Sequence, residues 1–126
     1  MVDLGKYSVK QLAETGVEFH LTDIKTGLEI EEPKFVLYGM DSDAVTIARR
    51  KFSELTAVKN IKDWKREEYY LDFIVACVKS WQDFQFGDRT IKDQDTAGLR
   101  LFLTEAPQFR EQIGEFVTER SNFLAD

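Results

Sequence analysis

The chain has 126 residues, 43% hydrophobic and 32% charged, which is typical of one soluble globular domain with a small core. The formal net charge of −6 argues against a nucleic-acid-binding protein and against binding to anionic membranes. We expect neither a signal peptide nor a membrane span, and the single Cys and single His exclude an intramolecular disulfide, a structural zinc site and a multi-histidine metal site.

The first forty residues predict a short helix followed by a β-hairpin. Residues 8–15 place apolar side chains at helical spacing, and Gly16 is suited to end the helix. Residues 17–22 then alternate apolar and polar side chains, which is the period of a strand and places His20 on the solvent face. A second extended run closes an irregular antiparallel hairpin over residues 17–38.

An Asp-Ser-Asp sequence stands between this hairpin and a helical pattern, and it resembles either a metal loop or a helix cap. A calcium loop of the EF-hand kind needs Glu at its twelfth position, which is Phe52 when counted from Asp41. Asp41 or Ser42 can instead accept hydrogen bonds from the first free N–H groups of a helix, and Asp43 suits its positive end. We therefore interpret the segment as a cap.

From Ser42 onward the pattern predicts about four helices. The second begins near Asp63 and is expected to keep Trp64 and Trp81 on or beside its buried face, followed by a loop at 85–93. The third spans residues 96–105, and the fourth has Pro107 in its first turn. The expected core positions are Val45, Phe52, Ile74, Val78, Leu101, Ile113 and Phe116.

The predicted fold class is α+β and predominantly helical. The chain is expected to form one domain over residues 1–126, with the short helix and β-hairpin in residues 1–40 and a bundle of about four helices in residues 41–126.

The sequence predicts no enzyme, no cofactor and no bound metal. It contains no nucleophile elbow, phosphate-binding loop or dinucleotide-binding glycine pattern. Cys77 lies in an apolar helical segment and is interpreted as a core residue. Glu67 and Glu68 are adjacent on a helix, so their side chains diverge by about 100° and do not form one site. The basic cluster at 48–51 is interpreted as a solvated helix face, with Arg49 and Arg50 as possible donors to an acidic partner.

One apolar stripe near the C-terminus has two interpretations. Ten Phe and two Trp are more aromatic residues than a core of this size requires. The stripe either closes the core or docks on another protein, and we carry its members as candidate interaction residues. They repeat at spacings of four, three, four and three: Phe109, Ile113, Phe116, Arg120 and Phe123.

The segment KFVLYGMDSDA, followed by a helix containing RRKF, resembles the corresponding region of tail assembly chaperones of long non-contractile-tailed bacteriophages, the lambda-like minor tail protein G family. The later segment VKSWQDFQFGDRTIKDQDTAGLRLFLTEAPQFREQIGEFVTERSNFL is similar to the later half of that family. The resemblance covers most of the chain from about Phe35 onward, while the preceding part matches only as a helix and a hairpin.

The resemblance implies a protein of the host cytoplasm that is absent from the finished virion. It implies binding to the tape measure protein and the tail tube protein, self-association, and a longer form made by ribosomal frameshifting. Two alternatives stay open. One is a small cytosolic adaptor or regulator that binds another protein, and the other is an enzyme with a site assembled from residues set aside above.

Overall fold

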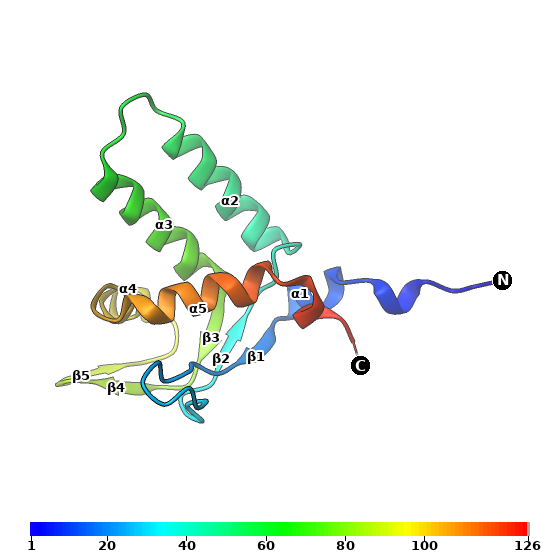
Figure 1. Cartoon of the computed structure of the whole chain (residues 1–126), viewed down its shortest axis with the longest axis horizontal. Helices are drawn as coiled ribbons and strands as arrows, with labels where there is room; N and C mark the ends of the chain where they lie inside the picture. The colour runs from blue at the N-terminus through cyan, green and yellow to red at the C-terminus, as the bar shows by residue number, and fades with distance from the viewer. Residues whose placement is uncertain (126) are drawn as a thin grey trace.

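The computed structural model describes residues 1–125 and combines helices with two small sheets in an α+β fold (Figure 1). Its elements follow in the order η1 (Gly5–Tyr7), α1 (Lys10–Thr15), β1 (Val17–Phe19), β2 (Phe35–Leu37), α2 (Asp43–Thr56), α3 (Asp63–Cys77), β3 (Val78–Trp81), β4 (Phe84–Phe86), β5 (Arg89–Ile91), α4 (Thr96–Glu105), α5 (Pro107–Thr118) and η2 (Arg120–Phe123). Among the described residues, no helix combines the length and the apolar character needed to cross a membrane.

A three-stranded antiparallel sheet has β2 between β1 and β3. Phe35 of β2 pairs with Phe19 on one side and with Trp81 on the other, and the register with β3 shifts just before Leu37. The side chains of Phe19, Phe35, Leu37 and Trp81 are all buried, so this small sheet contributes directly to the core. The predicted antiparallel hairpin over 17–38 is confirmed by the β1–β2 pairing.

The second long helix ends earlier than predicted, because α3 stops at Cys77 and the next four residues form β3. The apolar residues at 77, 78 and 81 have the spacing of one helix face, but they are buried equally well when the helix ends and a strand follows. The spacing therefore does not reveal where α3 ends. The backbone of β3 bonds to β2, which lies far away in the sequence. Trp64 was expected beside the buried face and is instead 62% exposed.

The predicted loop at 85–93 largely forms a second sheet, the β4–β5 hairpin. Its turn contains Gly87 in the left-handed region, with φ of 61°, which glycine adopts at low cost. Phe84 and Phe86 place their rings 5.0 and 5.2 Å from the ring of Phe102. Strands therefore interrupt the helices of residues 41–126, and a bundle of about four helices is not confirmed.

The core lies between the central sheet and helices α3, α4 and α5. Of the predicted core positions, Val45, Ile74, Val78 and Ile113 are buried, while Phe52 and Phe116 are half-buried. Leu101 is wrong as a core position because its side chain is 39% exposed. At about 100° per residue it lies opposite the face of α4 that is buried, which consists of Leu99, Phe102 and Leu103.

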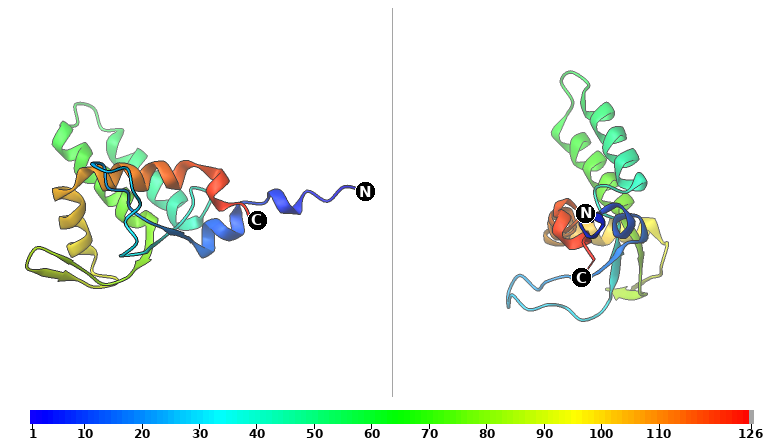
Figure 2. Two further views of the ribbon diagram at one scale, coloured as in Figure 1. Left: turned by 60° about the horizontal axis from the view of Figure 1, so that its bottom comes forward. Right: turned by 90° about the vertical axis from the view of Figure 1, so that its right-hand side faces the viewer.

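Helices α2 and α3 form an antiparallel hairpin that stands away from the body of the molecule (Figures 1 and 2). The long loop between β1 and β2, residues 20–34, lies on the opposite side of the molecule in Figure 1 and in the right view of Figure 2. The first residues of the chain extend away from both. This arrangement leaves the end of the α2–α3 hairpin without covering elements.

Candidate interaction surface on the α2–α3 hairpin

The Asp-Ser-Asp segment begins α2 as a helix cap. The Oγ of Ser42 accepts a hydrogen bond from the backbone N–H of Val45 at 3.1 Å, and Asp43 lies in the first turn. Asp41 bonds instead to the guanidinium of Arg120, at 2.8 Å to Nε and 3.0 Å to Nη2. The predicted cap is confirmed, and these contacts fix where the hairpin leaves the body.

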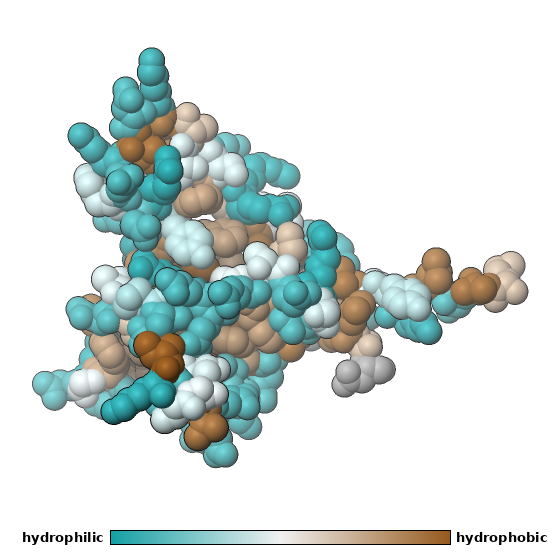
Figure 3. All heavy atoms as spheres, viewed as in Figure 1, coloured by the Kyte–Doolittle hydropathy of each residue, from teal (hydrophilic) through white to brown (hydrophobic). Residues whose placement is uncertain are grey.

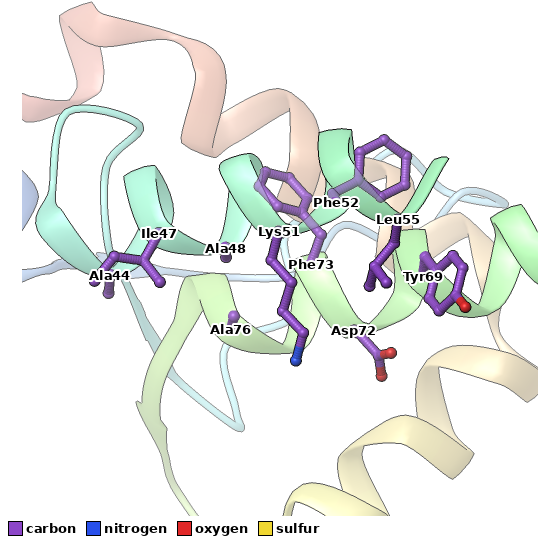
Figure 4. Close-up of a pocket in the computed structure, with 10 residues that line it drawn as sticks. All are labelled: Ala44, Ile47, Ala48, Lys51, Phe52, Leu55, Tyr69, Asp72, Phe73 and Ala76. Atoms are coloured by element: carbon purple, nitrogen blue, oxygen red, sulfur yellow. The ribbon is translucent and has the colours of Figure 1, made fainter. Parts of the chain in front are cut away.

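Helix α2 packs mainly on α3 and leaves much of its apolar surface open. Of the residues in α2, Val45 alone is fully buried, and Ile47 is 64% exposed. An open groove runs between the two helices, with Lys51 and Asp72 among the residues that line it (Figure 4). The apolar residues of this groove, which we call the hairpin groove, are Ala44, Ile47, Ala48, Phe52, Leu55, Tyr69, Phe73 and Ala76.

A second pocket, the distal pocket, continues the hairpin groove toward the tip. Leu55 and Tyr69 line both. The distal pocket is also lined by the loop between the helices and by the start of α3, with the residues Val58, Asn60, Ile61, Lys62, Trp64 and Lys65. Hydrophobic atoms surrounded by hydrophilic ones are visible at this tip in Figure 3.

Cationic and aromatic groups stand together in the distal pocket. The ammonium of Lys65 lies 5.5 Å from the ring centres of both Trp64 and Tyr69. Such cation–π contacts hold flat aromatic rings in place beside a positive charge. The pocket therefore combines an apolar floor with a positively charged rim.

The predicted C-terminal stripe does not form one open surface. Helix α5 ends at Thr118, so Arg120 and Phe123 belong to η2. Ile113 and Phe123 are buried, and their side chains face the interior.

The remaining aromatic members of the stripe are half-buried against other rings. The ring of Phe116 lies 4.8 Å from that of Phe19, and the ring of Phe109 lies 5.5 Å from that of Phe102. This placement favours the interpretation of the stripe as part of the core over its interpretation as a docking face.

Arg120, the charged member of the stripe, has an intramolecular partner. Its two-bond contact with Asp41 joins η2 to the start of α2. The Arg120 guanidinium lowers the pKa of the Asp41 carboxyl. This pair serves the packing of the C-terminal segment on the body.

Cys77 has no features of a nucleophile. It is buried, and burial raises the pKa of its thiol to about 12, so the thiol stays protonated at neutral pH. Within residues 1–125, no three His, Cys, Asp or Glu side chains are grouped so as to hold a metal ion.

His20 was predicted to face solvent, but only 17% of its side chain is exposed. Its Nε2 lies 2.9 Å from Oε2 of Glu18, and its Nδ1 lies 2.9 Å from the carbonyl oxygen of Glu31. The hydrogen bond to Glu18 raises the pKa of His20. Glu18 lies in β1, whereas the carbonyl of Glu31 comes from the returning β1–β2 loop, for which strand periodicity gives no signal.

Sequence reasoning missed the hairpin groove. Val45 and Phe52 of α2 were assigned to the core, and the only signal for a second use of this helix was Ile47, an apolar residue on another face. Comparisons of the chain with protein-family models, curated proteins and solved structures found no match. The hairpin presents an open groove lined mainly by apolar side chains.

Proposed function

We propose that the protein is a bacteriophage tail assembly chaperone, which acts by binding other proteins and catalyses no reaction. Its clients are the tape measure protein and the tail tube protein, and it also self-associates. It acts in the host cytoplasm, is absent from the mature virion, and has a longer form made by ribosomal frameshifting. The observation that carries the proposal is the open hairpin groove, taken together with the resemblance of the sequence to this family.

The hairpin groove suits an amphipathic helix as its client. Two antiparallel helices leave a furrow between them into which a third helix packs its apolar face. Ile47 and Ala48 supply apolar contacts from α2, and Phe73 supplies one from α3 (Figure 4). A tape measure protein is a long helical chain with apolar stripes, which need cover from water until the tube forms around them.

Charged groups at the margin of the groove suit a reversible contact. Lys51 and Asp72 belong to opposite helices, and Asp72 also bonds to Arg100 of α4. Polar rims of this kind surround the apolar centre of transient protein interfaces. The net charge of −6 keeps a complex of several copies soluble.

Co-expression with the tape measure protein encoded in the same genome tests the proposal. The wild type is expected to co-purify with this client, and Ile47→Ser is expected to weaken the complex at least about tenfold by removing an exposed apolar contact. Leu101→Ser is the matched control, because Leu101 is an exposed leucine on α4 that does not line the hairpin groove, and this variant should bind as the wild type does. A wild-type protein that fails to hold the tape measure protein would rule out the chaperone function.

A further inference from the structure

Charge is divided unequally between the α2–α3 hairpin and the rest of the chain. Residues 49–66 carry seven basic and two acidic side chains, a formal net charge of +5. The other 108 residues carry 10 basic and 21 acidic side chains, a formal net charge of −11. The hairpin from the middle of α2 to the first turn of α3 is therefore a positive region on an otherwise strongly negative molecule.

The part of this region nearest the end of the hairpin borders the distal pocket. Lys62 and Lys65 line the pocket, and Lys59 lies in the loop between its apolar residues. Val58 and Trp64 are exposed there, although folding gains nothing from apolar side chains in that position. A partner for this pocket needs apolar side chains with carboxylates beside them.

The β1–β2 loop carries this complementary pattern. Its two exposed apolar residues are Ile24, which is 70% exposed, and Leu28. Leu28 is followed directly by Glu29, and Glu31 and Glu32 are exposed nearby. We call residues 20–34 the acidic loop, which contains four carboxylates and two lysines.

We propose that the acidic loop of one copy binds the distal pocket of a second copy, with its exposed aliphatic side chains in the pocket and its glutamates facing the lysines of the rim. The two surfaces lie on opposite sides of the molecule, so the acidic loop of a chain cannot reach the distal pocket of the same chain (Figure 1 and the right view of Figure 2). A contact between two different surfaces joins copies head to tail and extends into a ring or an open helical array.

The inference rests on the proposed function, because it names the surfaces of the self-association that the chaperone proposal includes. A head-to-tail array would place successive hairpin grooves along an extended helical client. The distal pocket holds the neighbouring copy, and the part of the groove nearer the body, around Ala44 and Ile47, stays open for the client.

A second copy fits the pocket better than a nucleic acid does. The pocket is lined by the aliphatic residues Leu55, Val58 and Ile61, which suit the side chains of Ile24 and Leu28. The body, with its net charge of −11, would repel a polyanion bound along the hairpin. The same body attracts the basic tip of another copy.

Charge reversal on each surface tests the contact with the purified protein alone. Lys59→Glu with Lys62→Glu changes the rim, and Glu31→Lys with Glu32→Lys changes the acidic loop; all four side chains are exposed. Sedimentation velocity at about 0.05 M salt, where charges act over roughly 14 Å, is expected to show self-association of the wild type that decreases as salt is added. Each double variant should associate at least about tenfold more weakly.

The mixture of the two variants gives the decisive result. A reversed rim matches a reversed loop, so an equimolar mixture is expected to form a complex that neither variant forms alone. Unchanged thermal unfolding of both variants shows that the changes act on association rather than on folding. Glu18 is left unchanged, because its side chain bonds to that of His20 and a change there would disturb the fold of the protein.

Three results would overturn the inference: a wild type that stays monomeric at high concentration and low salt, variants that associate as the wild type does, or a mixture that stays monomeric. A fluorescent single-stranded oligonucleotide that binds the wild type but not the rim variant, without self-association, would assign the tip to nucleic acid instead. No client is present in this test, so its failure is distinct from failure to capture the tape measure protein.

Discussion

Replacing Phe123 separates the two interpretations of the C-terminal stripe. Phe123 is 1% exposed, and its ring stands edge-on to that of Phe116 at 5.6 Å. Its ring also closes over Gly39, where a Cβ would lie 3.0 Å from it. Phe123→Ala therefore leaves a cavity enclosed by side chains and backbone, and such changes cost about 3–5 kcal/mol of unfolding free energy.

A loss of this size is a large part of the about 5–15 kcal/mol that stabilises an ordinary domain. For a chain of this length it lowers the melting temperature by roughly 10–20 °C. Urea unfolding followed by circular dichroism measures the difference, with Leu101→Ala, at an exposed site, as a control expected to change stability by about 0.5 kcal/mol or less. A Phe123→Ala protein that keeps its stability but loses its client would refute the core assignment and restore Phe123 as an interface anchor.

Three further predictions concern single residues. Gly39→Ala should cost about 1–3 kcal/mol, because the new Cβ would lie 2.8 Å from the Cβ of Ala13; urea unfolding measures it, and unchanged stability would contradict this packing. The folded-state pKa of His20 should lie above 6.5, as NMR titration would show. Its contribution to stability is therefore complete below about pH 6.5 and is lost as the pH rises through the folded pKa, while His20→Gln should remove this dependence. Cys77 should resist thiol reagents at pH 8 until urea unfolds the protein, because burial keeps the thiol protonated; fast labelling of the native protein would contradict its burial.

Local chemistry made the helices predictable. The hydroxyl of Ser42 and the ring of Pro107 determine where α2 and α5 begin, and both signals act within one turn. The β1–β2 hairpin was likewise predictable, because alternating side chains mark a half-buried strand.

The strands β3, β4 and β5 were not predictable from the local pattern. Trp81 pairs with Phe35, which lies more than forty positions earlier, so the partner that turns residues 78–81 into a strand is absent from the local sequence. The β4–β5 hairpin is short and half exposed, and its apolar residues Phe84 and Phe86 are ordered by contact with α4. In both cases tertiary contacts outweigh local propensity.

The hairpin groove was hidden from sequence reasoning for a related reason. An apolar stripe on a helix predicts burial without indicating whether the covering surface belongs to the same chain. On α3 the stripe Leu71, Ile74 and Cys77 is covered by the body. On α2 the corresponding stripe is covered only on the side of α3, so Phe52 and Leu55 remain partly exposed.

The composition of α2 is what connects this exposure to binding. A helix of 14 residues that buries Val45 alone adds little to the core, and an isolated helix of that length is marginal in water. Replacing Ile47 and Val58 by polar residues would leave the hairpin equally well folded and make it less prone to aggregation, since neither side chain is covered by the body. Folding therefore does not account for apolar residues at these positions, whereas a client in the hairpin groove would account for Ile47 and a neighbouring copy in the distal pocket would account for Val58. The same reasoning would give a role to the basic rim, which in the proposed head-to-tail contact meets the acidic loop of a neighbouring copy.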